Sequence, residues 1–207
     1  MTNDRSQSRD AAHFDRIYAG REDPWNFRGS PYEREKYNAT IVALPPRHFE
    51  KALEIGCSIG ELTRLLAPSC GRILGLDISE APIATAQRLS AGCDNVTFRR
   101  MTVPAEWPDG TFDLIVLSEV LYFLAPLDIR TLADRVTAGL HPGGVVLLVN
   151  YLGCNDGDPL TGDNAAETFI AEIGERMSQD LRGHRDSFRI DRLVKITPPP
   201  KTPATTR

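Results

Sequence analysis

A glycine-rich turn in the stretch KALEIGCSIGELTRLLA is the first place where the chain could do chemistry. Glycines in a turn between a strand and a helix let the backbone pass close to a ligand, and the helix presents unpaired N–H groups. The dinucleotide form of this turn, G-x-G-x-x-G, holds a pyrophosphate. Here the pattern is Glu54-x-Gly56-x-x-x-Gly60, with Cys57 as a small filler inside the turn. The acidic residue suits a ligand that carries an ammonium and a sulfonium, which argues against a nicotinamide cofactor.

Further polar residues follow at the ends of two later apolar runs. Asp77 ends the run RILGLD, 17 residues after the last glycine of the turn. That separation is close to the ~20 residues at which a second-strand carboxylate binds ribose hydroxyls, and Ile78 would then lie against one face of an adenine. The run FDLIVLSEVLYFL places Ser118, Glu119 and Tyr122 where a ligand at the carboxyl ends of the strands must meet the chain.

Several of these residues also have a purely structural interpretation. Asp77 could cap a helix, because Asp suits the N-cap position. Glu119 is either an exposed charge at the start of a loop or a group that holds an acceptor ammonium or takes its proton. Tyr122 either lines the same pocket or is buried as a core aromatic. His141 precedes Pro-Gly-Gly, so we expect a turn there rather than a catalytic base.

Short apolar runs that alternate with amphipathic segments predict the elements that position these residues. The runs LIVL and VVLLV are continuously apolar, as in strands that helices cover on both faces. Strands alternating with helices indicate right-handed βαβ units, and therefore an α/β fold with a Rossmann-like, doubly wound, mostly parallel sheet. The expected strands are 51–55, 72–76, 96–100, 113–117 and 144–150, and the expected helices are 60–67, 81–91 and 129–140.

The segments that flank this core complete a single domain. A helix is expected after Pro31, a second over 165–181, and a last strand in FRIDRLVKI. The low apolar content of the two ends predicts disorder there. The expected division is a disordered end over 1–12, a domain over 13–196 made of an N-terminal lid (13–50), a ligand-binding core (51–150) and an acceptor loop, helix and strand (151–196), and a disordered tail over 197–207.

Composition excludes several function classes. The 207 residues carry a net charge of −4, so there is no basic footprint for nucleic acid or an anionic membrane. No apolar run approaches the ~20 residues of a membrane span, and the polar N-terminus does not resemble a secretion signal. The four cysteines and four histidines are scattered, so we expect no metal site and no disulfide framework. These features predict a cytoplasmic protein, either a monomer or a weak homodimer.

Taken together, EIGCSIG, LDIS, FDLIVLSEVLYFL and LHPGG resemble the ordered motifs of class I S-adenosylmethionine-dependent methyltransferases, over Leu53–Asn150. The resemblance implies that S-adenosylmethionine is the cofactor and S-adenosylhomocysteine the product. The pattern departs at Thr102, which stands where such enzymes often carry an acidic residue for the adenine amino group. The cofactor-binding residues that the resemblance implies are Glu54, Gly56, Cys57, Gly60, Asp77, Ile78, Thr102, Val103 and Ser118.

A narrower resemblance, to the NodS methyltransferases, comes from DPWNFRGSPYEREKY, SEVLY and AETFI. That group N-methylates a deacetylated glucosamine on a chitin-type oligosaccharide, so the resemblance implies a small-molecule or oligosaccharide acceptor. It places Trp25 and Tyr32 in a lid over the cofactor and acceptor; otherwise these two residues would be core contacts that hold the N-terminal helix. Glu119 and Tyr122 would border the acceptor, with Glu119 as the catalytic residue. Apart from the resemblance, Arg34 and Lys36 are expected as solvated helix charges, although either of them, or Arg28, could bind the cofactor carboxylate.

Other functions stay open at the level of the sequence. The loop NDGDPLTGDNAAETFI keeps only the AETFI end of the NodS pattern, so the exact acceptor does not carry over. A methyltransferase that acts on an oxygen or carbon atom of another small molecule would share every cofactor motif. A cofactor-binding regulator without turnover is a third interpretation. The missing G-x-G-x-x-G disfavours an oxidoreductase.

Overall fold

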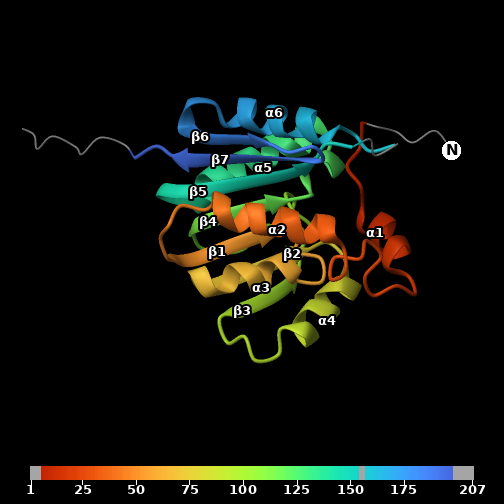
Figure 1. Cartoon of the computed structure of the whole chain (residues 1–207). Helices are drawn as coiled ribbons and strands as arrows, with labels where there is room; N and C mark the ends of the chain where they lie inside the picture. Colours follow the sequence, from red (N-terminus) through yellow and green to blue (C-terminus); the bar gives the residue numbers. More distant parts are fainter. Residues whose placement is uncertain (1–5, 154–156, 198–207) are drawn as a thin grey trace, which may run out of the picture.

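The computed structural model describes residues 6–153 and 157–197, in which seven strands form one sheet of order β3-β2-β1-β4-β5-β7-β6 (Figure 1). Neighbouring strands from β3 to β5 are parallel, whereas β7 runs antiparallel to both β5 and β6. This is the Rossmann-like, mostly parallel sheet expected from the sequence. The strands are β1 (Phe49–Ile55), β2 (Cys70–Asp77), β3 (Val96–Arg100), β4 (Phe112–Ser118), β5 (Leu140–Tyr151), β6 (Met177–His184) and β7 (Phe188–Lys195).

Helices cover both faces of the sheet. On one face, Tyr37 of α2 belongs to a buried cluster with Val116 of β4; on the other, Phe169 of α6 belongs to a cluster with Ile115. Successive residues of β4 thus point into two separate cores, which is why the run LIVL is apolar throughout. The helices are α1 (Ala11–Tyr18), α2 (Pro31–Ala43), α3 (Glu61–Leu66), α4 (Glu80–Leu89), α5 (Pro126–Gly139) and α6 (Gly162–Ile173), with 3-10 turns η1 (Ala67–Ser69), η2 (Leu121–Phe123) and η3 (Gly174–Arg176).

The helix expected over 165–181 is wrong in its second half. α6 ends at Ile173, and the chain turns through Gly174, whose φ is +55°, before it enters β6. β6 forms the edge of the sheet and, apart from the buried Met177, carries mostly exposed side chains. Polar side chains are usual on edge strands, where they discourage pairing with another chain, and they hide such a strand from a hydrophobic-pattern analysis.

The disorder expected over 1–12 is contradicted in the part of that segment that the structure describes. The Arg9 N–H donates to the Phe123 carbonyl at 2.8 Å, and the Arg9 guanidinium lies 3.0 Å from the Asp158 carboxylate. Asp10 caps α1 by accepting a hydrogen bond from the first turn of that helix. These residues are held in place by hydrogen bonds and an ion pair rather than by burial of apolar side chains. An amino-acid composition low in apolar residues therefore does not show that the segment is ordered.

The remaining expectations about the ends fall outside the structure. Residues 1–5 and 198–207 lie outside the described residues, and the division into lid, core and acceptor segment stays a prediction. Within residues 6–153 and 157–197, no helix combines the length and apolar character that crossing a membrane requires.

Candidate active site

The glycine-rich turn lies between β1 and α3, and its two glycines have different tasks. Gly56 and Gly60 have φ angles of +81° and +79°, which residues with a side chain rarely adopt. A Cβ on Gly56 would stand 3.3 Å from the Ser118 carbonyl oxygen, and one on Gly60 would stand 2.7 Å from the Phe98 ring. Gly60 therefore leaves room for the Phe98 side chain of β3. Gly56 exposes backbone without a side chain to the main cavity of the protein, which lies at the carboxyl ends of the parallel strands.

Asp77 ends β2, and backbone groups orient both of its carboxylate oxygens. Oδ2 accepts the N–H of Ser58 at 3.0 Å, and Oδ1 accepts that of Ser79 at 2.9 Å. Each oxygen keeps a further acceptor position, which suits the paired hydroxyls of a ribose. Burial raises the pKa of Asp77 to about 6, although the backbone donors oppose this shift. Asp77 and the following Ile78 both line the main cavity.

Glu54 and Cys57 lie behind the turn. Because side chains alternate along β1, Glu54 points to the α3 side, where its carboxylate accepts a hydrogen bond from Thr63 Oγ1 at 2.5 Å. Burial raises the pKa of Glu54 to about 7 and that of the Cys57 thiol well above its usual value. Glu54, which the sequence places among the cofactor-binding residues, thus lies behind the turn and does not line the main cavity. Ser118 is also buried and, like Glu54 and Cys57, borders a small separate hollow.

A cavity of about 1020 Å³ lies at the carboxyl ends of the parallel strands. Open α/β sheets bind ligands at this edge, where the strand order reverses between β1 and β4. Small-molecule sites usually measure ~300–1,000 Å³, so this cavity has room for a nucleoside and a second ligand. The residues expected in the site that line it are Trp25, Tyr32, Gly56, Asp77, Ile78, Thr102, Val103, Glu119 and Tyr122.

The N-terminal segment also contributes two aromatic residues that the sequence did not single out. In α1, Tyr18 Oη lies 2.5 Å from Ser58 Oγ, and Phe14 packs edge-on against Phe123 with ring centroids 5.0 Å apart. Trp25 in turn packs edge-on against Tyr18 at 5.3 Å. The spacing of four residues between Phe14 and Tyr18 puts them on one face of a helix, and this is the signal that could have found them.

Of the three cations considered for the cofactor carboxylate, Lys36 alone lines the cavity. Arg28 pairs with Glu22 at 3.0 Å on the surface. Arg34 is exposed on α2. Lys36 is buried on the same helix, with its ammonium 5.0 Å from the centroid of the Tyr32 ring. Lys36 and Arg34 therefore lie on different sides of α2, one buried and one exposed, a difference that the sequence left open.

Glu119 follows β4 with a φ of +57°, a backbone conformation that is costly for a residue with a side chain. Its Oε1 accepts from Lys36 Nζ at 2.8 Å, and its Oε2 accepts from Tyr122 Oη at 2.7 Å and Tyr151 N at 3.0 Å. Both interpretations of Tyr122 hold, because its ring is buried while its hydroxyl meets a carboxylate of the cavity. Burial, together with Glu119, raises the pKa of Tyr122 well above its usual value.

Known proteins resemble this chain over most of its length. A family model described as a methyltransferase domain matches residues 53–146. Nodulation protein S of Rhizobium tropici is 30% identical over 174 residues, which make up 80% of this chain and 72% of that relative. The chain belongs to the NodS-like class I methyltransferases. It is therefore an S-adenosylmethionine-dependent enzyme.

Two further known proteins are similar to this NodS-like methyltransferase. The crystal structure of the N-methyltransferase NodS from Bradyrhizobium japonicum WM9, in complex with S-adenosylhomocysteine, matches with a TM-score of 0.77 and 27% identity over 89% of this chain and 97% of that one. Phosphoethanolamine N-methyltransferase 1 of Arabidopsis thaliana is 28% identical over 122 residues, 58% of this chain but 25% of that relative. The cavity fits S-adenosylmethionine, because Asp77 offers two oriented acceptor oxygens and Gly56 brings backbone without a side chain to the lining.

Proposed function

We propose that this NodS-like enzyme methylates the amine of a saccharide-type acceptor, such as a deacetylated chitin oligosaccharide. The observation that carries the proposal is the carboxylate of Glu119, which lines the same cavity as Asp77 and is fixed at the ends of β4 and β5. A carboxylate at that position matches the charge of an ammonium acceptor. The similarity to the NodS relatives supports the same class of acceptor.

In this proposal, the cofactor lies across the carboxyl ends of β1 and β2. Asp77 accepts hydrogen bonds from the ribose, Ile78 and Val103 border the adenine, and Thr102 offers a hydroxyl to the adenine amino group. The bare backbone at Gly56 lets the chain approach the rest of the ligand closely. When bound, S-adenosylmethionine supplies an electrophilic methyl group. The task of the protein is to align the acceptor with that group and to exclude water.

The acceptor lies beside Glu119, Tyr122 and Tyr151. A sugar amine is protonated near neutral pH and must lose a proton before its lone pair can attack. A carboxylate within reach of its N–H groups can hold the amine in place while that proton leaves, directly or through water. Trp25 and Tyr32 line the same cavity, where their rings provide flat apolar surfaces for a sugar and help to exclude water.

The charges around the cavity favour an amine over a phosphate-bearing acceptor such as phosphoethanolamine. The two long basic side chains of the lining are already paired: Arg9 with Asp158 at 3.0 Å, and Lys36 with Glu119 at 2.8 Å. A phosphate would therefore have to displace a carboxylate from its cation. The acidic residues that line the cavity are Asp10, Glu33, Asp77, Glu119, Asp128 and Asp158.

Transfer of a labelled methyl group to chitin tetrasaccharides tests the proposed function. We expect labelling of the fully deacetylated tetramer and none of its N-acetylated form, because acetylation removes the amine but keeps the sugar chain. Phosphoethanolamine is the control for an amine that lacks the sugar and carries a phosphate. Labelling of both tetramers would point to O-methylation, and no labelling by protein that binds S-adenosylhomocysteine would favour a regulator.

A further inference from the structure

Three charged side chains meet at the acceptor side of the cavity, and we refer to Glu33, Lys36 and Glu119 as the Lys36 cluster. Lys36 Nζ lies 3.0 Å from the Glu33 carboxylate and 2.8 Å from that of Glu119. The side chain of Lys36 is 2% exposed and that of Glu33 8%, whereas that of Glu119 is 19% exposed. With all three groups ionised, the cluster carries one net negative charge, and Glu119 is its most accessible member.

The hydrogen bonds of Glu119 define what it can still bind. A carboxylate has about four acceptor positions. The ammonium of Lys36, the hydroxyl of Tyr122 and the N–H of Tyr151 occupy three of them. One position therefore remains for a ligand in the cavity. A carboxylate held by three donors is fixed in place and well suited to accept one more N–H.

Lys36 is itself held on several sides, which makes it a fixed counter-cation. Besides the two carboxylates, the ring of Tyr32 lies 5.0 Å from its ammonium and that of Tyr37 lies 5.9 Å away. Cation–π contacts of this kind strengthen when they are desolvated. The next carboxylate of the lining, Asp158, is already paired with Arg9. The net charge at this point of the cavity is therefore set by the Lys36 cluster.

We propose that Lys36 is a positioning residue, which holds Glu119 so that its one open acceptor site binds an N–H of a cationic amine. The inference rests on the proposed function and specifies the acceptor further: the site selects the protonated amine by charge, Glu119 holds one of its N–H groups, and another proton of the amine passes to water before the lone pair attacks the methyl group. Lys36 acts through Glu119, so its removal changes the charge of the site and not only its shape.

Calorimetric titration with two cofactor analogues tests this inference without a known acceptor. S-adenosylhomocysteine is neutral at its sulfur, whereas sinefungin carries an amine, protonated at neutral pH, where the transferred methyl group would be. We expect the wild type to bind sinefungin more tightly than S-adenosylhomocysteine, by on the order of tenfold. A difference of this size corresponds to the attraction between one unit charge and a nearby opposite charge in a partly screened site. Glu119→Gln is expected to abolish this preference and leave the affinity for S-adenosylhomocysteine unchanged.

Lys36→Met gives a readout that a purely structural role would not produce. Burial raises the pKa of Glu33, and Lys36 opposes that shift. The other titratable groups around Glu33 are Tyr32, Tyr37, Glu54, Glu61 and Glu119. Without Lys36, the pKa of Glu33 is expected to rise further above its usual value, because the cation that opposes the effect of burial is lost. The cluster then becomes more negative as pH rises through that pKa, so the preference for sinefungin should increase with pH. In the wild type and in Lys36→Arg, which keep the cation beside Glu33, the preference should depend less on pH.

Matched variants on the same helix provide the controls. Arg34→Met and Glu35→Gln make the same changes in charge at exposed positions of α2, and we expect both to behave as the wild type does. Persistence of the preference in Glu119→Gln, or the same dependence on pH in Lys36→Met as in the wild type, would overturn the inference. A preference that depends on Glu119 in an enzyme that methylates no amine would refute the proposed function alone. Failure of the wild type to bind S-adenosylhomocysteine would overturn both.

Discussion

Asp77→Ala is expected to weaken the binding of S-adenosylhomocysteine by about a hundredfold, because two hydrogen bonds from the ribose to a charged acceptor are lost at ~1.5 kcal/mol each. The substitution also leaves the backbone N–H groups of Ser58 and Ser79 without their acceptor, which loosens the glycine-rich turn. Isothermal titration calorimetry of the wild type and the variant measures the change. NAD serves as the control ligand and should bind to neither protein.

Asp113→Ala is the matched control for this substitution. The Asp113 carboxylate also accepts two backbone N–H groups, from Glu50 at 2.8 Å and Lys51 at 2.9 Å. It lies near the start of β4 and does not line the cavity. Its removal should lower the stability of the fold and leave the affinity for S-adenosylhomocysteine unchanged. Equal affinities of the wild type and Asp77→Ala would contradict the proposed ribose contact.

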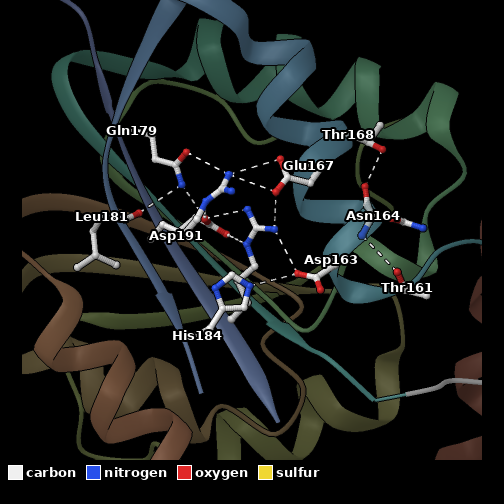
Figure 2. A network of polar contacts seen from close by, with 11 residues as sticks. Thr161, Asp163, Asn164, Glu167, Thr168, Gln179, Leu181, His184 and Asp191 are labelled. Atoms are coloured by element: carbon white, nitrogen blue, oxygen red, sulfur yellow. Dashed lines mark hydrogen bonds and ion pairs between the residues drawn. The ribbon is translucent and has the colours of Figure 1, made fainter. Parts of the chain in front are cut away.

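Asp191→Ala is expected to lower the free energy of unfolding by about 3–5 kcal/mol, because it removes one partner of a buried ion pair. Asp191 and Arg189 are both buried on β7, where the guanidinium donates to the two carboxylate oxygens at 2.6 and 3.0 Å. Figure 2 shows Asp191 within a network that also includes Glu167 and Asp163 of α6. The network ties the last helix to the last two strands, so its loss affects the whole edge of the sheet.

Urea denaturation monitored by circular dichroism measures this effect, and Asp163→Ala is the matched control. Asp163 also pairs with Arg189, at 3.2 Å, but its side chain is 53% exposed. Exposed ion pairs contribute at most about 1 kcal/mol, so the control should unfold nearly as the wild type does. Equal losses in the two variants would show that burial of the Asp191 pair is not what makes it important.

The central part of the fold could be predicted because its strands are buried on both faces and therefore need apolar residues throughout. β4 is buried on both faces, and its continuous apolar run follows directly from that position. β6 has no such requirement, since an edge strand is stabilised by pairing with β7 while its side chains stay in water. The N-terminal contacts of Arg9 escaped prediction for a related reason, because they join polar groups that lie far apart in the sequence.

The site was predictable in position and less so in orientation. The glycine-rich turn and Asp77 could be located from their spacing, because that spacing reflects how a strand leads into a helix. The sequence could not show that Glu54 supports the turn from behind, since this depends on the α3 side chain that meets it. Nor could it show that Lys36 pairs with Glu119, because 83 residues separate the two and only the folded sheet joins them.

The reversed direction of β7 has a practical consequence for handling the protein. Because β7 runs antiparallel to β5, its last residues lie beside the start of β5, at the edge of the sheet opposite the cavity. Lys195 Nζ donates there to the Leu140 carbonyl at 2.6 Å. The segment around Arg9, in contrast, lines the cavity. A dye or a surface tether attached beyond β7 should therefore leave ligand binding undisturbed, whereas one attached ahead of α1 would obstruct it.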